Sequence, residues 1–250
     1  MIVTINRPTV RNAVNLDVHL GVGRALESAE ADDTVRSVVI TGAGDRAFCA
    51  GADLSAIARG ESLLPASDDE RAWGFAGFTA HAITKPTIAA INGVALGGGF
   101  EIVLAADLAV AAEDAVMGLP EVRRGIIAAG GGAFRLGAQI PSKIANELLY
   151  TGETITAQRA RELGLVNAVV ARRDVVPAAL GLAERINQSA PLAVRASKRI
   201  SARIDGERAV VDEPDWERSV REFSAIIQTE DATEGPLAFT ERRSPQWRTR

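Results

Sequence analysis

The sequence has one cysteine, few aromatic residues and no excess of positive charge, and each shortage excludes a class of protein. A single cysteine cannot form an internal disulfide and supplies no cysteine cluster for a metal. Aromatic residues make up only 4% of the chain, which favours tight backbone packing over stacked aromatic platforms. The formal net charge of −4 argues against a general nucleic-acid binder, because such proteins usually carry a basic surplus.

Long apolar runs are missing as well. The most apolar region, residues 94–112, is interrupted by Glu101 and Asp107, so we expect no transmembrane helix. The start of the chain has no basic segment followed by an apolar one, so no leader is predicted and the protein is expected to be cytoplasmic. The 47% of apolar and 24% of charged residues are ordinary for a globular protein with one large core.

Glycine is plentiful, and its most informative cluster lies just before Glu101. Residues 87–91 are a short apolar run that predicts a buried strand, and three glycines at 97–99 lead into a helical pattern beginning near Phe100. Consecutive glycines cost entropy, but they let the backbone approach a ligand and present bare N–H groups. Glu101 then lies in the first helical turn, where it either complements the helix dipole or serves as a catalytic acid or base.

A second glycine motif, Gly-Ala-Gly-Asp-Arg-Ala at residues 42–47, resembles the fingerprint of dinucleotide-binding loops. That fingerprint requires a long helix directly after the glycines. Residues 48–53 have no helical period, and Gly51 interrupts them. We therefore predict a plain turn here and no nicotinamide cofactor.

Elsewhere, short strands alternate with helices and a helical tail follows, which is typical of an α/β core with a C-terminal appendage. Strands are predicted over residues 1–6, 37–41, 87–91 and 108–111. Helices are predicted over residues 16–32, 70–84, 142–151, 156–163, 175–189 and 215–229, with others opening at the glycines 130–132 and at Pro191. Residues 231–250 give a mixed pattern.

Four short motifs occur in a specific order, although each is weak alone. They are Asn6-Arg7-Pro8 with Asn12-Ala13, the run from Ala47 to Leu54, the run from Ile91 to Gly99, and Leu119-Pro120-Glu121. Together they resemble the enoyl-CoA hydratase/isomerase (crotonase) family along nearly the whole chain. Within that family, the tail from Glu230 to Trp247 and the segment 74–77 resemble the carnitinyl-CoA dehydratase branch most.

The resemblance implies an α/β fold of the crotonase type, also described as ClpP-like. Its core is a spiral of ββα units, here residues 1–188, and a helical C-terminal segment, residues 189–250, serves trimerisation. The implied assembly is a homotrimer or a hexamer built as a dimer of trimers. The implied substrate is an acyl-CoA thioester, so coenzyme A is part of the substrate and no separate cofactor or metal is expected.

By the same resemblance, the backbone N–H groups of Ala52 and Gly98 form an oxyanion hole, and Glu101 and Glu121 match the two carboxylates of the true hydratases. The residues implied to contact substrate or CoA are Ala50, Gly51, Ala52, Asp53, Leu54, Gly98, Ala129, Phe239 and Arg242. The last two match positions that touch the CoA of a neighbouring subunit.

Two features depart from the family pattern. Ala128-Ala129 stands where the family usually has Pro-Gly, and the glycine matched by Ala129 helps to hold the catalytic water through its backbone. The family also commonly has one more strand before the one at Met1, so this chain either starts late or has a shortened first hairpin.

The chemistry of hydration explains why two backbone amides and two carboxylates are required. Adding water to an α,β-unsaturated thioester places negative charge on the thioester oxygen, and two fixed amides stabilise it; losing one such donor typically costs roughly 3–4 kcal/mol. Two neighbouring carboxylates can share one proton, because like charges raise one pKa. We expect Glu101 to activate water and Glu121 to protonate the α-carbon, with these roles reversed for dehydration.

The expected reaction is the reversible hydration of a 2-enoyl-CoA to a 3-hydroxyacyl-CoA. The alternatives within the fold are dehydration of a charged or polar substrate such as carnitinyl-CoA, and double-bond isomerisation, which needs one carboxylate. An RNA-binding relative would need a continuous basic face, and the scattered arginine pairs disfavour it. A non-catalytic scaffold is disfavoured by the presence of both glutamates.

Other conspicuous residues have plainer interpretations. Cys49 is expected to be a small buried filler, because no base lies near it in sequence. His19 and His81 have no metal partner at ligand spacing and are expected to be structural or surface residues. The aromatic residues of segment 70–84 either line an acyl pocket or pack their helix, with neither alternative favoured: Trp73, Phe75 and Phe78.

Overall fold

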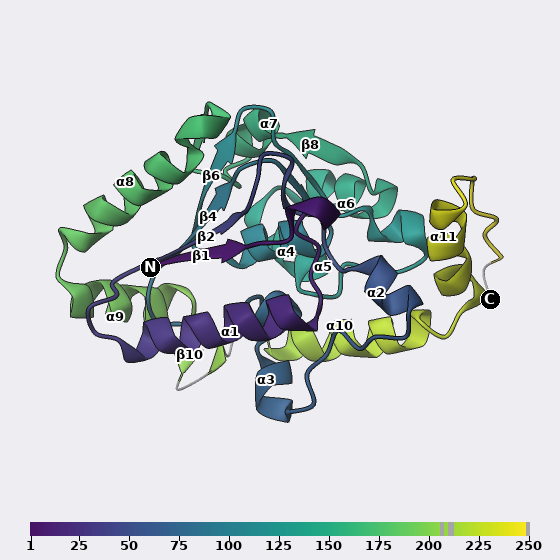
Figure 1. The fold of residues 1–250 in the computed structure, drawn as a ribbon, viewed down its shortest axis with the longest axis horizontal. Helices are drawn as coiled ribbons and strands as arrows, with labels where there is room; N and C mark the ends of the chain where they lie inside the picture. The colour runs from purple at the N-terminus through teal and green to yellow at the C-terminus, as the bar shows by residue number, and fades with distance from the viewer. Residues whose placement is uncertain (206–207, 210–212, 249–250) are drawn as a thin grey trace.

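A five-stranded parallel sheet forms one half of the core in the computed structural model, which describes residues 1–205, 208–209 and 213–248. Its spatial order is β1-β2-β4-β6-β9 (Figure 1). The strands are β1 (Ile2–Ile5), β2 (Val38–Gly42), β4 (Thr87–Ile91), β6 (Leu108–Ala112) and β9 (Ala168–Val170). Every residue of β2 and β4 is buried, as expected for central strands of a sheet covered on both faces.

A four-stranded sheet with the order β3-β5-β7-β8 forms the other half. Its strands are β3 (Ala47–Cys49), β5 (Val94–Leu96), β7 (Val116–Gly118) and β8 (Thr154–Thr156). The first three pair in parallel, and β8 pairs antiparallel to β7. Along the chain, β2 leads to β3, β4 to β5 and β6 to β7, so each pass adds one strand to each sheet. This alternation is the predicted spiral of ββα units.

Helices fill the connections and make up most of the C-terminal part. The longer ones are α1 (Leu16–Ala31), α4 (Gly98–Ala105), α5 (Gly132–Gln139), α6 (Ser142–Thr151), α7 (Ala157–Glu162), α8 (Val175–Asn187), α9 (Pro191–Ser201), α10 (Glu213–Ile226) and α11 (Glu230–Thr240). Shorter elements are η1 (Pro8–Val10), α2 (Leu54–Ala58), α3 (Asp68–Ala72), η2 (Phe75–Gly77), η3 (Pro120–Arg124), η4 (Arg172–Asp174) and the hairpin β10 (Ile204–Asp205) with β11 (Arg208–Ala209).

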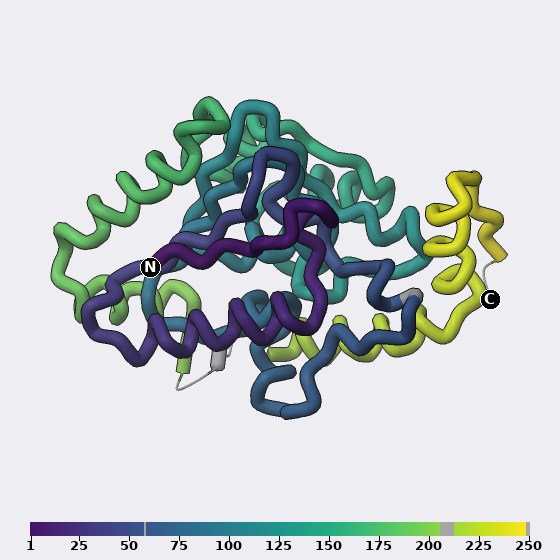
Figure 2. Tube along the Cα trace, viewed as in Figure 1, coloured from purple at the N-terminus to yellow at the C-terminus, as the bar shows by residue number. Residues whose placement is uncertain are grey.

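The C-terminal helices α8 to α11 run along the periphery of the molecule (Figure 1). Helix α8 contacts β2, β4 and β6, and so covers one face of the five-stranded sheet. From there the chain passes along α9 and α10 and reaches α11 at the opposite end of the molecule, next to the C-terminus (Figure 2). Helix α11 packs against η3, the short element that carries Glu121.

The predicted strands over 1–6, 37–41, 87–91 and 108–111 are confirmed, as are the helices over 16–32, 142–151, 156–163 and 175–189. The sequence did not predict the strands of the four-stranded sheet, each of which has only three residues. Such short strands carry too little periodicity to be recognised. The mixed pattern over 231–250 includes most of helix α11, which runs from Glu230 to Thr240, and the last two positions of the pattern lie outside the described residues.

The predicted helix over residues 70–84 is wrong. The structure has the short α3, a turn, and the irregular η2 in its place. Gly74, Ala76 and Gly77 all adopt positive φ, at 74°, 58° and 64°, and a right-handed helix cannot continue through them. A Cβ on Gly77 would lie 2.2 Å from the His19 carbonyl oxygen, so this turn packs directly onto α1.

Among the described residues, no helix is both long and apolar enough to cross a membrane. This agrees with the reading of residues 94–112, whose apolar run is divided between β5, α4 and β6.

Candidate active site

Glu101 lies in the first turn of α4, and its side chain points into the protein. The helix begins at Gly98, after Gly97 at a φ of 56°. Glu101 is only 4% exposed, and its Oε1 accepts a hydrogen bond of 2.9 Å from the N–H of Gly132. A mere dipole-complementing glutamate would face solvent, so burial favours the alternative of an acid or base.

The glycines 130–132 allow the chain to close around the carboxylate of Glu101. A Cβ on Gly130 would lie 2.4 Å from its Oε2, and a Cβ on Gly132 would lie 3.0 Å from its Cγ. Side chains at either position would push the carboxylate away. The sequence predicted only that these glycines open a helix; the signal that could have indicated more is their likeness to the glycines at 97–99.

Glu121 approaches the same place from η3. Its Oε2 is buried and has no hydrogen-bond partner among the described residues. A Cβ on Gly97 would lie 3.1 Å from its Oε1, so this carboxylate lies against the turn that leads into α4. The structure therefore brings Glu101 and Glu121 together beside Gly97 and Gly98, although 20 positions separate them in the chain.

Both carboxyl groups are electrostatically perturbed. Burial raises the pKa of Glu101, opposed by the N–H of Gly132 and by the charge of Arg135. Burial also raises the pKa of Glu121, and the neighbouring charge of Glu101 raises that pKa further. Because two buried carboxylates cannot both ionise easily at short range, the pair can hold one proton near neutral pH. This arrangement provides one acid and one base.

The amides of Ala52 and Gly98 come from two adjacent turns. A Cβ on Gly51 would lie 3.2 Å from the backbone nitrogen of Gly98, which measures how closely the two turns approach. Neither the Ala52 nor the Gly98 N–H donates to another backbone group among the described residues. Two adjacent amides with free N–H groups are what an oxyanion hole requires.

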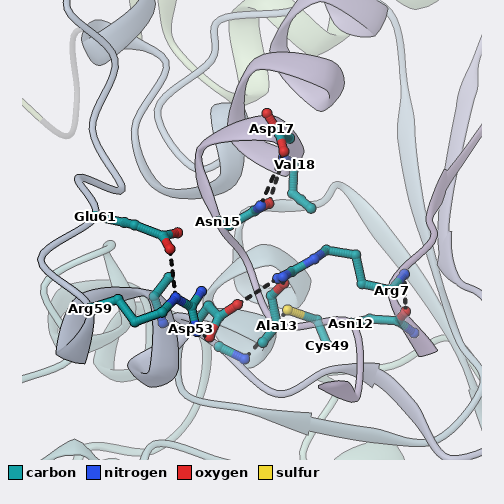
Figure 3. Close-up of polar contacts among 12 residues, drawn as sticks. Arg7, Asn12, Ala13, Asn15, Asp17, Val18, Cys49, Asp53, Arg59 and Glu61 are labelled. Atoms are coloured by element: carbon teal, nitrogen blue, oxygen red, sulfur yellow. Dashed lines mark hydrogen bonds and ion pairs between the residues drawn. The ribbon is translucent and has the colours of Figure 1, made fainter. Parts of the chain in front are cut away.

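The other residues of the run 50–54 are divided between interior and surface. Asp53 is 5% exposed, and its carboxylate pairs with Arg7 at 2.8 Å (Figure 3). Leu54 is exposed at the start of α2, and Ala50 is half-buried. The Asp53 carboxylate is therefore used inside the protein, and the contact of this run with CoA stays a prediction.

Phe75 is the aromatic residue of segment 70–84 that reaches the site. A Cβ on Gly98 would lie 2.2 Å from its ring, and a Cβ on Gly130 would lie 3.0 Å from its own Cβ. The ring thus lies against Gly98, while the start of the side chain lies beside Gly130, next to Glu101. In contrast, Trp73 stacks between His19 and His81, at 6.3 Å and 5.3 Å between ring centroids.

Ala129 lies near the site, but its amide is already engaged. Its N–H donates to the carbonyl oxygen of Ile127 at 2.9 Å, and its carbonyl accepts from the Ser219 hydroxyl of α10 at 3.2 Å. The family's glycine is implied to offer its backbone to water at this position, so water here would have to compete with the bond to Ile127. The contact with Ser219 was not foreseen from the sequence.

Phe239 and Arg242 lie at the end of α11. Phe239 is 53% exposed, and the Arg124 guanidinium lies 4.0 Å from the centre of its ring. Arg242 is exposed. Their contact with the CoA of a neighbouring subunit remains a prediction.

The plainer interpretations are supported for three residues. Cys49 is fully buried, and burial raises the pKa of its thiol to about 12, so it is no nucleophile. His19 contacts the carbonyl oxygen of Glu70 at 2.9 Å, and His81 pairs with Glu27 at 2.8 Å. Within the described part of the chain, no group of three or more acidic, histidine or cysteine residues is placed to hold a metal.

Comparison with known proteins gives a consistent result. The family model for enoyl-CoA hydratase/isomerase matches residues 1–250. The carnitinyl-CoA dehydratase of Proteus mirabilis is 41% identical over 251 aligned residues, covering 99% of this chain and 94% of that one. The crystal structure of carnitinyl-CoA hydratase from Mycobacterium avium is 56% identical, with a TM-score of 0.97 and coverage of 100% and 95%. An enoyl-CoA hydratase from Mycobacterium tuberculosis is 42% identical, with a TM-score of 0.75 and the same coverage.

Proposed function

Because this chain belongs to the enoyl-CoA hydratase/isomerase (crotonase) family, we propose that it is a hydro-lyase that removes water from, or adds it to, a CoA thioester. The observation that carries this proposal is the pair of carboxylates of Glu101, which is buried, and Glu121, which is half-buried with a buried Oε2. They lie beside the amides of Ala52 and Gly98, whose N–H groups donate to no other backbone group of the described residues. Acid, base and oxyanion donors then lie in one place, as this reaction requires.

In the dehydration direction, Glu121 takes the proton from the α-carbon. The electron pair of that C–H bond moves toward the thioester, and the N–H groups of Ala52 and Gly98 stabilise the charge on its oxygen. As the charge returns to form the double bond, the bond from the β-carbon to its hydroxyl breaks. Glu101 protonates the departing hydroxyl, and water leaves. Hydration is the same sequence in reverse.

For the substrate, we propose a 3-hydroxyacyl-CoA that carries a polar or charged group, of the carnitinyl-CoA kind. Simple 2-enoyl-CoA hydration is the reaction first expected from the sequence, but the relatives favour its alternative. The Mycobacterium avium carnitinyl-CoA hydratase has both higher identity and a higher TM-score than the Mycobacterium tuberculosis enoyl-CoA hydratase. Double-bond isomerisation would leave one buried carboxylate without a role.

A substrate panel tests this proposal. Carnitinyl-CoA, 3-hydroxybutyryl-CoA and crotonyl-CoA would be supplied to the purified protein, and gain or loss of the enoyl-thioester absorbance followed. We expect kcat/KM to be highest for carnitinyl-CoA. Preference for crotonyl-CoA would restore simple enoyl-CoA hydration as the function, and double-bond migration without exchange of water would indicate an isomerase.

A further inference from the structure

The segment from Arg7 to Val14 binds the chain on both sides of Ala52. The N–H of Val14 donates to the Gly51 carbonyl oxygen at 2.8 Å, and the N–H of Asp53 donates to the Val14 carbonyl oxygen at 2.9 Å. These bonds form an isolated parallel bridge between Val14 and Ala52. The residues before and after Ala52 are thereby fixed, while the Ala52 N–H itself donates to no other backbone group in the described part of the chain.

An ion pair completes this attachment. Nη1 of Arg7 lies 2.8 Å from Oδ2 of Asp53 and donates to the Ala13 carbonyl oxygen at 2.7 Å (Figure 3). The other oxygen of Asp53 accepts from the N–H of Ala56 at 3.1 Å, capping α2. Arg7 therefore joins the segment after β1 to the residue next to Ala52, across 46 positions of the chain.

Asn12 also anchors the segment from Arg7 to Val14 through its side chain. Its Oδ1 accepts from the N–H of Arg7, and its Nδ2 donates to the carbonyl oxygens of Ala43 and Ala47. Arg11 and Asn12 both adopt positive φ, at 56° and 57°, a conformation that is strained for a long side chain such as that of Arg11. Strained backbone of this kind persists where surrounding contacts over-determine it, often next to functional sites.

The surroundings of Asp53 favour its ionised form. Burial raises the pKa of Asp53, but the hydrogen bonds from Arg7 and from the Ala56 N–H outweigh it and hold that pKa below its usual range. The side chains of Asp53 and Arg7 are 5% and 27% exposed. The resemblance to the family implied that Asp53 contacts the substrate's CoA moiety, but both of its oxygens already have partners within the chain.

We propose that Arg7 and Asp53 are positioning residues for the oxyanion hole: their ion pair fixes the direction of the Ala52 N–H. The inference rests on the proposed function, because it assigns Ala52 to the thioester oxygen. An oxyanion donor acts through distance and angle, so a small rotation of this turn weakens charge stabilisation more than it weakens binding of the CoA moiety.

The variants Arg7→Met and Asp53→Asn test the pair, alone and combined. Methionine keeps the apolar stem of the arginine, and asparagine keeps an oxygen for the Ala56 N–H. We expect each single change to lower kcat about tenfold or more with KM nearly unchanged, and the double variant to lose no more than the worse single one. Arg7→Lys keeps the charge and should recover part of kcat. The control Glu61→Gln removes an exposed ion pair with Arg59 nearby and should leave kcat unchanged.

A second measurement does not depend on turnover. Butyryl-CoA, isotope-labelled at its thioester carbonyl, is saturated and cannot be hydrated. Its carbonyl stretch should fall in frequency when bound to the wild type, and fall less in Arg7→Met and Asp53→Asn. An equal shift in all proteins, or losses of kcat that multiply in the double variant, would overturn the inference. A full carbonyl shift in a wild type that turns over no panel substrate would overturn the proposed function and leave the positioning role standing.

Discussion

The N–H of Gly132 donates to the carboxylate of Glu101 across 2.9 Å, and this bond joins the two glycine-rich helix starts of the molecule. Gly98 opens α4, which carries Glu101, and Gly132 opens α5, which closes over it. Helix N-termini offer unpaired N–H groups to anions. The start of α5 thus holds the Glu101 carboxylate, and the start of α4 is the one we propose to face the thioester oxygen.

Gly130→Ala should damage catalysis without unfolding the protein. The added Cβ would lie 2.4 Å from Oε2 of Glu101, so the carboxylate must move. We expect kcat to fall roughly 100-fold, which is the typical contribution of a well-placed acid or base. Gly137→Ala is the matched control, because its Cβ would meet nothing within 4 Å in the same region of the chain. That variant should keep full activity, and activity in Gly130→Ala equal to this control would contradict the assignment of Glu101.

Glu101→Gln and Glu121→Gln should each fold and bind CoA thioesters but turn over very slowly. Glutamine keeps the shape of the side chain and cannot exchange the proton. Each change should cut kcat by about 10²–10⁴-fold, and the double variant should lose far less than the product of the two. The measurements are enoyl-thioester formation and deuterium incorporation from solvent at the α-carbon. Glu113→Gln, at an exposed position after β6, serves as the control.

An isomerase would give a different pattern in the same experiment. One substitution would abolish double-bond migration and the other would be tolerated, because isomerisation needs only one carboxylate. Full hydration by Glu101→Gln would remove Glu101 from the mechanism and leave Glu121 as the one candidate acid or base.

The two carboxylates should also make stability depend on pH. Burial raises the pKa of both above the ordinary value of 4.5, so the folded state binds protons more tightly than the unfolded state. The free energy of unfolding therefore falls as pH rises from that value through the raised pKa values. The double glutamine variant lacks these two titrating groups, so its free energy of unfolding should not fall in this way. We therefore expect the melting temperature of the variant minus that of the wild type to be larger at about pH 8.5 than at about pH 5.5. If the melting-temperature difference between the variant and the wild type stays constant with pH, the raised pKa values are contradicted.

The position of Glu101 in the first turn of a helix could be predicted from the sequence. The pattern that indicates it, a strand followed by glycines and a helix, lies entirely within residues 87–101. The pairing of Arg7 with Asp53 could not be predicted in the same way, because 46 positions separate the residues and only the fold joins them. The prediction of a helix through the turn at 74–77 was wrong although Phe75 and Phe78, three positions apart, have helical spacing. The positive φ of Ala76 depends on packing against α1 and leaves no sequence signal of its own.

We expect the protein to form a homotrimer or a dimer of trimers. The C-terminal helices expose apolar side chains that a monomer would leave in water. These are Leu192 at 75%, Ile200 at 78%, Val220 at 61% and Ile227 at 48% exposure. Light scattering at micromolar concentration measures the mass, and a monomer would contradict the prediction together with the cross-subunit role of Phe239 and Arg242. Val220→Glu should weaken the assembly, because it would bury an unpaired charge in the contact.

Phe75 should limit which acyl groups the enzyme accepts. Its ring lies over Gly98, where the thioester is proposed to bind, and its Cβ lies beside Gly130 and thus near Glu101. Shortening this side chain removes a wall along the reacting carbons, so bulkier acyl groups gain room while small ones lose contacts. The series Phe75→Leu and Phe75→Ala should raise kcat/KM for a branched substrate relative to 3-hydroxybutyryl-CoA stepwise, by about 10–200-fold at most. If kcat/KM falls equally for the branched substrate and for 3-hydroxybutyryl-CoA, their ratio stays fixed. That result would mean that Phe75 only supports the fold of its turn.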